Sequence, residues 1–212
     1  YRNDENMTDT EYRRVYQDMV QAMDDGVGQI MRTLKEQGVL DNTIIIYTSD
    51  NGGEKVAAEK YPGNNGYFRG FKGGAYEGGC RVPAIFYYPK AWGHRKTSEP
   101  MHCIDFMPTF LDMCNVKNPR KVDGVSMLPT LEKNTPMPQR KLYSAETGFM
   151  TVTDGDWKCV WGKNDKVELF NLMTDRNEEH DLSAMYPERV EGYKKDMLNW
   201  WADCTKGTRL EG

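Results

Sequence analysis

The residues of this chain that could do chemistry gather in one stretch, Thr43–Pro83. An apolar β-branched run, Ile44–Ile46, leads into Ser-Asp-Asn-Gly-Gly and predicts a strand that runs out at Asp50 and Asn51. Carboxylate and amide oxygens are ligands that Ca²⁺ and Mg²⁺ take in proteins, but such cations take about six to eight oxygens, so further ligands must come from elsewhere. The alternative interpretation is an Asx turn that ends the strand.

Lys72 provides a positive charge in the same stretch, within Phe-Lys-Gly-Gly. Nine of the chain's twenty glycines fall between Gly52 and Gly79, and glycine lets backbone approach a ligand closely. A compact ammonium in such a loop can reach an anionic oxygen as a point charge, although a solvated loop lysine is the alternative. Glu77 and Arg81 bracket two of these glycines, and we expect an ion pair or backbone hydrogen bonds there to pin the loop.

The histidines and cysteines give weaker signals. None of the three histidines has metal-ligand spacing, which favours surface or hydrogen-bonded core positions. The five cysteines form no Cys-x-x-Cys pair and suggest neither a zinc site nor a disulfide framework, so we interpret them as small buried hydrophobes. The histidines are His94, His102 and His180, and the cysteines are Cys80, Cys103, Cys114, Cys159 and Cys204.

A helix and two strands are expected to position the candidate site. A capping box and helical apolar spacing predict a helix from Asp9 to Gln37. Gly26 and Gly28 inside it each cost about 1 kcal/mol relative to alanine, and we expect close packing against another element to compensate. A short turn then leads to the Ile44 strand, and Val82–Tyr88 indicates a second buried strand, with parallel neighbours expected for both. Ligands bind beyond the carboxyl ends of strands in such α/β sheets, which places the site at the end of the first strand.

The sequence pattern changes further along the chain. Residues 105–113 suit a short helix with Pro108 in its first turn, and another helical turn is expected around residues 127–131. From Arg140 onward, short apolar segments alternate with hairpin turn signals and predict a small antiparallel sheet, which a helix over residues 187–202 closes.

Composition and charge argue against several classes of partner. A net charge of -4 without a basic tract argues against nucleic-acid binding, and no apolar run approaches the ~18 residues of a membrane span. The chain starts at Tyr1 with a polar stretch and shows no signal peptide, so we expect a processed or truncated piece of a longer protein. We predict an α/β fold in two parts: residues 1–139, part of an α/β core, and residues 140–212, a small antiparallel-sheet subdomain with a packed helix.

Several of these motifs occur in the order seen in the sulfatase family of the alkaline-phosphatase superfamily, which the chain closely resembles. The resemblance covers nearly the whole chain, and as a set the motifs are highly specific. One departure is Arg176, which stands where the family usually has proline and puts nothing catalytic in doubt. The motifs are L-D-N-T-I-I-I-Y-T-S-D-N-G (40–52), K-G-G-A-Y-E-G-G-C-R-V-P (72–83), C-I-D-F-M-P-T (103–109), V-D-G-V-S (122–126) and E-L-F-N-L-M-T-D-R-N-E-E-H-D-L (168–182).

The resemblance implies a fold and roles for three residues. The fold is the C-terminal part of an alkaline-phosphatase-like α/β sandwich plus a small antiparallel β-sheet subdomain with a C-terminal helix. Asp50 and Asn51 would be ligands of a divalent cation, usually Ca²⁺ with Mg²⁺ as the alternative, and Lys72 would be a catalytic and substrate-binding residue that contacts the sulfate. The chemistry agrees, because hydrolysis of a sulfate ester requires stabilisation of charge on the sulfuryl oxygens and the leaving oxygen.

The family's nucleophile is not found in this sequence. It is a formylglycine made from Cys or Ser in C/S-x-P/A-x-R; no cysteine here lies in that motif, and Ser98 comes closest but has His102 where Arg is needed. The nucleophile, a first pair of metal-binding aspartates and further active-site Lys and His residues precede this region in the family. The chain thus resembles the C-terminal half alone, and we expect it to be inactive and poorly stable without the missing N-terminal half as its partner.

The function that the resemblance implies is hydrolysis of the sulfate esters of a sulfated small molecule or glycan, that is, of a glycan sulfate or an aryl sulfate. The enzyme would be exported, whether periplasmic, secreted or lysosomal. Two alternatives stay open: a phosphonate or phosphate-ester hydrolase of the same superfamily, and a non-catalytic fragment that binds anionic glycans or a partner. The presence of Asp50, Asn51 and Lys72 together argues against the second, since a relic has no need of all three.

Overall fold

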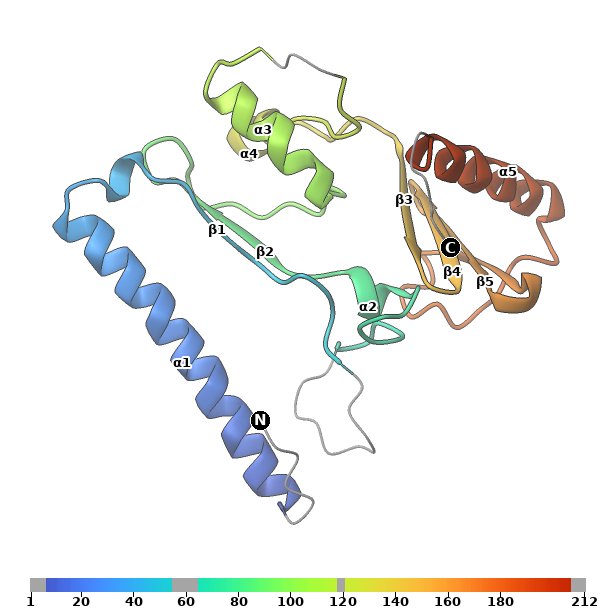
Figure 1. The fold of residues 1–212 in the computed structure, drawn as a ribbon, viewed down its shortest axis with the longest axis horizontal. Coiled ribbons are helices and arrows are strands. Elements are labelled where there is room, and N and C mark those ends of the chain that lie inside the picture. Colours follow the sequence, from blue (N-terminus) through green and yellow to red (C-terminus); the bar gives the residue numbers. More distant parts are fainter. Residues whose placement is uncertain (1–6, 55–64, 118–120, 207–212) are drawn as a thin grey trace.

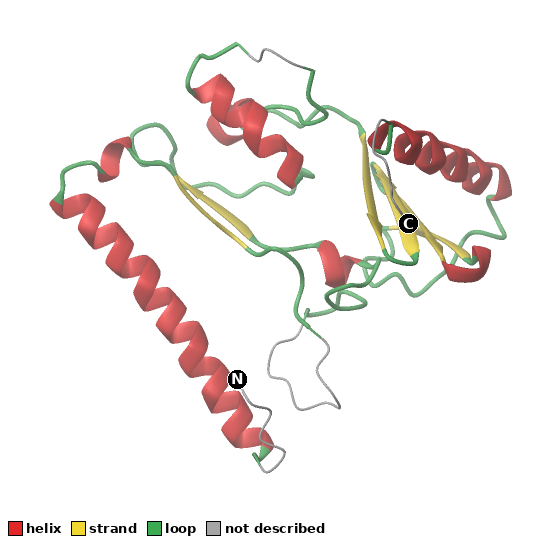
Figure 2. Ribbon diagram, in the orientation of Figure 1, coloured by secondary structure: helices red, strands yellow, loops and turns green. Residues whose placement is uncertain are grey.

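A computed structural model describes residues 7–54, 65–117 and 121–206 (Figure 1). Within these residues there are two antiparallel sheets, one of two strands and one of four. The described part of the connection between the two strands of the smaller sheet contains the short helix α2 (Glu77–Cys80), which lies between the two sheets (Figures 1 and 2). This arrangement brings the loop segments that carry the predicted site against the larger sheet.

Helix α1 (Asp9–Glu36) confirms the first predicted element. The capping box is formed, because the Thr8 N–H donates to the Glu11 carboxylate at 2.8 Å and the Glu11 N–H donates to the Thr8 hydroxyl. Within the described chain, no residue of α1 is buried, and a Cβ on Gly26 would meet nothing within 4 Å. The predicted close packing of this glycine is therefore wrong for this chain. The apolar side chains exposed on α1 are Tyr16, Met19, Val20, Met23 and Ile30.

The two-stranded sheet corrects a prediction. After the 3₁₀ turn η1 (Leu40–Asn42), β1 (Ile45–Thr48) pairs with β2 (Ala84–Tyr87), and the pairing is antiparallel, with Ile45 opposite Tyr87. Neither strand is buried, and no further described strand flanks them. A β-branched run predicts that a strand exists and packs, but it carries no information on the direction of the neighbouring strand or on which segment covers it.

A buried carboxylate ties the helical segment to the larger sheet. Asp105, fully buried, ends the turn η2 (Cys103–Asp105) and precedes α3 (Phe106–Met113), the helix predicted with Pro108 in its first turn. Its two oxygens accept hydrogen bonds from both terminal nitrogens of Arg140. They also accept from the Val125 N–H at 3.0 Å and the His102 N–H at 2.9 Å. The second short helix is α4 (Leu128–Lys133), which confirms the turn expected there.

The four-stranded sheet and its closing helix confirm the second predicted part. The strands pair in sequence order, and α5 (Pro187–Cys204) packs on one face through Val190, Tyr193 and Met197. Only Cys159 among the five cysteines is buried, so the interpretation of all five as buried hydrophobes is wrong for the other four, whose thiols are free and whose residues are exposed. The strands are β3 (Lys141–Glu146), β4 (Phe149–Asp154), β5 (Trp157–Gly162) and β6 (Val167–Asn171), with the turn η3 (Lys163–Asp165) between the last two.

The opposite face of this sheet is also covered. Strand residues alternate between faces, so Val160 and Phe170 point away from α5. They form a second core cluster with Ala75 and Leu172, and Tyr76 packs against it. The segment before α2 therefore docks on the larger sheet. A division of the chain into domains at residues 139 and 140 stays a prediction.

The pH dependence of stability should report on Asp105. Burial raises the pKa of the Asp105 carboxyl, but the hydrogen bonds from Arg140, Val125 and His102 outweigh it and hold this pKa below its usual value. A depressed folded-state pKa gives stability that is present above the unfolded-state pKa of about 4 and is lost as the pH falls through the folded-state pKa. We expect Asp105→Asn to remove this acid-dependent part of the unfolding free energy. The same variant should lower the free energy of unfolding by about 3–5 kcal/mol at pH 7, because Arg140 is left without its partner. Urea unfolding between pH 3 and 7 measures both, and an unchanged pH profile would contradict the assignment.

Candidate functional site

The loop after β1 carries the two predicted cation ligands. Asp50 is exposed, and its Oδ1 accepts the Asn51 N–H at 3.0 Å, the local contact expected of an Asx turn. The Asn51 side-chain amide donates to the Gly52 carbonyl at 2.8 Å. Among the described residues, Asp50 Oδ2 and Asn51 Oδ1 accept no hydrogen bond. Two oxygens, one of them charged, thus remain for a ligand.

The glycines next to these residues bring the loop after β1 into contact with helix α2. The Gly52 N–H donates to the Gly79 carbonyl at 2.9 Å, and a Cβ on Gly52 would lie 1.8 Å from the Gly78 carbonyl oxygen. No side chain fits there, which explains the residue type in physical terms. The Asn65 side chain adds a bridge, since it accepts from the Gly53 N–H at 2.8 Å and donates to the Gly70 carbonyl at 2.9 Å.

Lys72 lies in the segment that these contacts bring close. Its backbone N–H donates to the Gly53 carbonyl at 3.0 Å, and its residue is exposed. The structure therefore joins the Lys72 segment to the Asp50–Asn51 loop through backbone contacts. The roles of the three side chains as ligands and substrate contact stay predictions.

The donor set fits a hard cation only in part. The described residues contain no group of three or more His, Cys, Asp or Glu side chains that could hold a metal ion. Asp50 and Asn51 supply oxygen donors of the type that Ca²⁺ and Mg²⁺ prefer, but fewer than either cation takes. Such a site would need further oxygen ligands beyond these two side chains.

Helix α2 is held by a network of buried charges that the sequence did not predict in full. The expected Glu77–Arg81 ion pair is present, with Glu77 Oε2 at 2.5 Å from Arg81 Nε. The other oxygen, Glu77 Oε1, lies 2.8 Å from the Lys158 ammonium on β5. Lys158 is 1% exposed and also lies 2.9 Å from Glu178 Oε1. Glu178, fully buried, accepts the Glu77 N–H at 2.7 Å through its second oxygen.

The pKa shifts in this network show which charges are stable. Burial lowers the pKa of the Lys158 amine, but the neighbouring Glu77, Cys80 and Glu178 groups outweigh it and raise this pKa above its usual value. Burial raises the pKa of Glu77, but Lys158 and Arg81 bring it below its usual value. Burial dominates at Glu178, whose pKa is raised despite Lys158. Lys158 and Glu77 thus form the charged pair, and Glu178 is the weaker acid.

An aromatic contact supports the same segment. The Tyr76 hydroxyl donates to Glu168 Oε2 on β6 at 2.5 Å, and the Arg69 guanidinium lies 3.7 Å from the centre of the Tyr76 ring. Burial, followed by the hydrogen bond to Glu168, raises the pKa of Tyr76 to about 12, so this hydroxyl stays protonated as a donor. Arg69 also lies 3.5 Å from Glu168 Oε1.

Sequence reasoning missed Lys158 and Glu178. Lys158 lies within Trp-Lys-Cys-Val-Trp, and a single charge inside an apolar strand predicts a buried ion that needs a counter-charge. That signal does not identify the partners, which lie 81 residues before and 20 residues after it in the chain.

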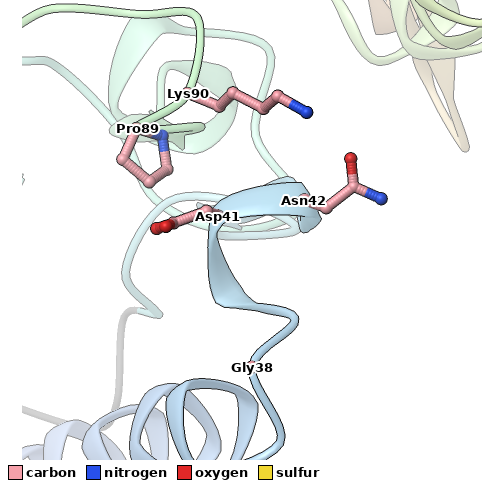
Figure 3. Close-up of a pocket in the computed structure, with 5 residues that line it drawn as sticks. All are labelled: Gly38, Asp41, Asn42, Pro89 and Lys90. Atoms are coloured by element: carbon pink, nitrogen blue, oxygen red, sulfur yellow. The ribbon is translucent and has the colours of Figure 1, made fainter.

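A surface hollow of about 340 Å³ lies elsewhere and has no such chemistry. Gly38, Asp41, Asn42, Pro89 and Lys90 line it, at the start of β1 and the end of β2 (Figure 3). The Asp41 and Lys90 side chains point away from each other (Figure 3). Because β1 separates this hollow from Asp50, it is not part of the candidate site.

Comparison with solved structures defines the class of fold. The chain superposes on Ps i-CgsB with a TM-score of 0.79 at 30% identity, covering 89% of this chain and 43% of that one. It superposes on the phosphonate monoester hydrolase of Agrobacterium radiobacter with a TM-score of 0.65 at 23% identity, covering 90% of this chain and 41% of that one, which shows the fold alone. The fold is the C-terminal part of an alkaline-phosphatase-like α/β sandwich with a small antiparallel-sheet subdomain, as predicted.

Comparison with sequences narrows the class to one family. Residues 1–116 match the family described as Sulfatase, and residues 63–198 match the one described as N-sulphoglucosamine sulphohydrolase, C-terminal. The chain is 35% identical to the N-acetylgalactosamine-6-sulfatase of Mus musculus over 173 residues, which are 78% of this chain and 33% of the relative. It is 34% identical to the N-acetylglucosamine-6-O-sulfatase of Bacteroides thetaiotaomicron over 187 residues, 81% of this chain and 32% of that relative. The chain belongs to the sulfatase family, and it spans about a third of the length of these two relatives.

The structure also bears on the membrane prediction. In the part of the chain that it describes, every helix is too short or too polar to cross a bilayer.

The contact at Gly52 gives a test of the loop geometry. We expect Gly52→Ala to lower the free energy of unfolding by about 1–3 kcal/mol, because the new methyl group overlaps the Gly78 carbonyl and one loop must move. The matched control is Gly192→Ala in α5, where a Cβ meets nothing within 4 Å and alanine favours the helix by up to about 1 kcal/mol. Urea unfolding of the two variants gives the comparison, and equal stability of the two would show that the loops do not approach as described.

Proposed function

We propose that this chain is the C-terminal portion of a sulfatase that hydrolyses sulfate esters. In this proposal, Asp50 and Asn51 bind a divalent cation, usually Ca²⁺, and Lys72 contacts the sulfate group of the substrate. The observation that carries the proposal is the pair of backbone hydrogen bonds, Gly52 to Gly79 and Lys72 to Gly53, which hold the ammonium-bearing segment against the loop of the two oxygen ligands.

The residues suit the chemistry of sulfate ester hydrolysis. The reaction adds water to R–O–SO₃⁻, breaks a sulfur–oxygen bond and leaves an alcohol, a sulfate ion and a proton. Negative charge shifts between the sulfuryl oxygens and the leaving oxygen as that bond breaks, and fixed positive groups stabilise it. The Lys72 ammonium can donate hydrogen bonds to such an oxygen, and the exposed glycine-rich backbone beside it leaves room for the substrate. A cation held by Asp50 and Asn51 would supply Lewis-acid stabilisation of the same charge.

The nucleophile belongs to the part of the protein that this chain does not contain. We expect a formylglycine there, since none of the five cysteines here lies in a Cys-x-Pro/Ala-x-Arg motif. The chain alone would then be inactive, and its partner would be the N-terminal half of the same enzyme. The exposed apolar side chains of α1 and the uncovered faces of β1 and β2 support this, because they are surfaces of the kind that pack against another element.

The similar proteins suggest a sulfated sugar as the substrate. Two of them are named for the 6-sulfates of N-acetylgalactosamine and N-acetylglucosamine, and Ps i-CgsB, 30% identical, has been solved in complex with k-i-k-neocarrahexaose. We therefore favour a sulfated glycan over an aryl sulfate. The likeness to the phosphonate monoester hydrolase is below 25% identity, so a phosphonate or phosphate-ester substrate is the second candidate. An exported location for the enzyme remains part of the proposal.

The first test is the role of Lys72. In the complete protein, Lys72→Ala should lower kcat/KM for N-acetylgalactosamine 6-sulfate by about 10²–10³-fold, because one charge-stabilising donor is lost while the fold is kept. Release of inorganic sulfate is measured, and 4-nitrophenyl phosphate serves as the competing substrate class. Lys90→Ala, an exposed lysine at the far end of β2, is the matched control and should leave turnover unchanged. Turnover unaffected by Lys72→Ala would remove this residue from the site, and faster release of phosphate than sulfate would favour the second candidate.

The second test is cation binding. Anything that binds only the folded state raises the unfolding temperature, so Ca²⁺ added to the chelator-treated complete protein should raise Tm. Asp50→Asn should abolish most of that rise, because it removes the charged ligand. Asp41→Asn, an exposed acid before β1, should keep it. If Asp50→Asn and the wild type respond equally to Ca²⁺, Asp50 is not a ligand, whatever the activity of either protein.

A further inference from the structure

The buried charge network beside the candidate site has no role in the chemistry proposed above. Lys158 reaches out of β5 on the face opposite α5, where its neighbours on the sheet are Val160 and Phe170. Its ammonium lies between two carboxylates, 2.8 Å from Glu77 Oε1 and 2.9 Å from Glu178 Oε1. All three side chains are at most 8% exposed. Ions buried to this extent need compensation from every neighbour, so their relative positions are tightly constrained.

Glu178 forms hydrogen bonds at two points with the segment that carries Lys72. Its carboxylate accepts the N–H of Glu77, the first residue of α2, at 2.7 Å. Its backbone carbonyl accepts a hydrogen bond from the Arg69 guanidinium at 2.8 Å. Arg69 and Glu77 lie on either side of Lys72 in the sequence, so both ends of the short segment that carries Lys72 are fixed to the sheet subdomain.

Backbone hydrogen bonds continue from these two points to the predicted site residues. The Gly78 N–H donates to the Arg69 carbonyl at 2.7 Å, which closes the segment into a loop. The Gly79 carbonyl then accepts the Gly52 N–H, one residue after Asn51. The Lys72 N–H donates to the Gly53 carbonyl. A displacement of α2 would therefore move Lys72 and the Asp50–Asn51 loop.

We propose that Lys158 and Glu178 are positioning residues of the active site: acting through Glu77, which both of them contact, they set the place of Lys72 relative to the loop of Asp50 and Asn51. This inference rests on the proposed function and deepens it, because it assigns the four-stranded sheet a part in catalysis. Neither residue touches the substrate.

The chemistry of the network favours positioning over simple adhesion. The apolar cluster of Ala75, Phe170 and Leu172 already attaches the segment to the sheet, and apolar contacts of this kind tolerate small shifts. A buried ammonium between two fixed carboxyl groups does not, since each shift leaves a buried charge less well paired. The raised pKa of Lys158 and the lowered pKa of Glu77 keep this pair charged at neutral pH. Arg81 on Glu77 fixes the second oxygen, so the carboxylate cannot rotate freely.

The test compares Lys158→Met, Glu178→Gln and the conservative Lys158→Arg in the complete protein. Lys158→Met should lower kcat for N-acetylgalactosamine 6-sulfate, per folded molecule, by about 100-fold, the loss expected for a displacement of roughly 1 Å at a reacting centre. Lys158→Arg, which keeps the positive charge, should retain much of the wild-type kcat. Hydrogen exchange at the amides of Gly52, Lys72 and Gly78 should accelerate in Lys158→Met, while the amides of β4 stay protected. If Lys158→Met does not fold, Glu178→Gln carries the same expectations with a nearly isosteric change of side chain.

Lys195→Met, an exposed lysine on α5, is the matched control and should change neither turnover nor exchange. Unchanged kcat per folded molecule in the network variants would overturn the proposal. So would an equal loss of protection in β4 and at the three loop amides, because the network would then merely stabilise the sheet. If the wild type releases no sulfate, the proposed function fails, and the exchange pattern alone still decides whether the network positions the loop.

Discussion

The structure depends on one buried ammonium held between two carboxylates. Lys158 comes from the second position of β5, Glu77 from a four-residue helix, and Glu178 from the loop after the last strand. Removing such ions from water costs several kcal/mol each, and the cost is offset only when all partners are in place. The network therefore forms only when the four-stranded sheet and the glycine-rich segment are both folded and docked. The network joins the four-stranded sheet, which has an apolar core, to the glycine-rich segment that carries Lys72.

The glycines define how close the remaining contacts can be. Gly52, Gly78 and Gly79 allow two backbones to hydrogen-bond where any Cβ would overlap a carbonyl oxygen. Functional residues commonly lie on loops that a rigid scaffold positions, and here the scaffold is the face of the sheet that α5 does not cover. The Asp105–Arg140 pair makes a second connection, from the turn before α3 to the residue that precedes the first strand of the same sheet. Two ion pairs, together with the apolar cluster of Ala75, Phe170 and Leu172, thus join the sheet subdomain to the rest of the described chain.

Sequence patterns predicted the elements whose signals are local. The capping box of Thr8 and Glu11, the hairpin turns after Arg140 and the apolar spacing of the last helix all depend on residues within a few positions of one another. The pairing direction of β1 and β2 and the exposure of four cysteines depend on distant segments, and these predictions were wrong. Lys158 and Glu178 were missed for the same reason, since a buried charge identifies its partner only through the tertiary fold. The sulfatase family, by contrast, could be predicted because its motifs are short, ordered and specific as a set.

The most direct test of this account is a double-mutant cycle between Glu178→Gln and Lys72→Ala, with kcat/KM for N-acetylgalactosamine 6-sulfate measured in the complete protein. If Glu178 acts by placing Lys72, its loss should matter less once the Lys72 ammonium is gone. We expect a coupling free energy of at least about 1 kcal/mol, outside the range of roughly 0.3–0.5 kcal/mol within which independent sites add. Strict additivity of the two substitutions would contradict it, because the buried network and the catalytic lysine would then act separately.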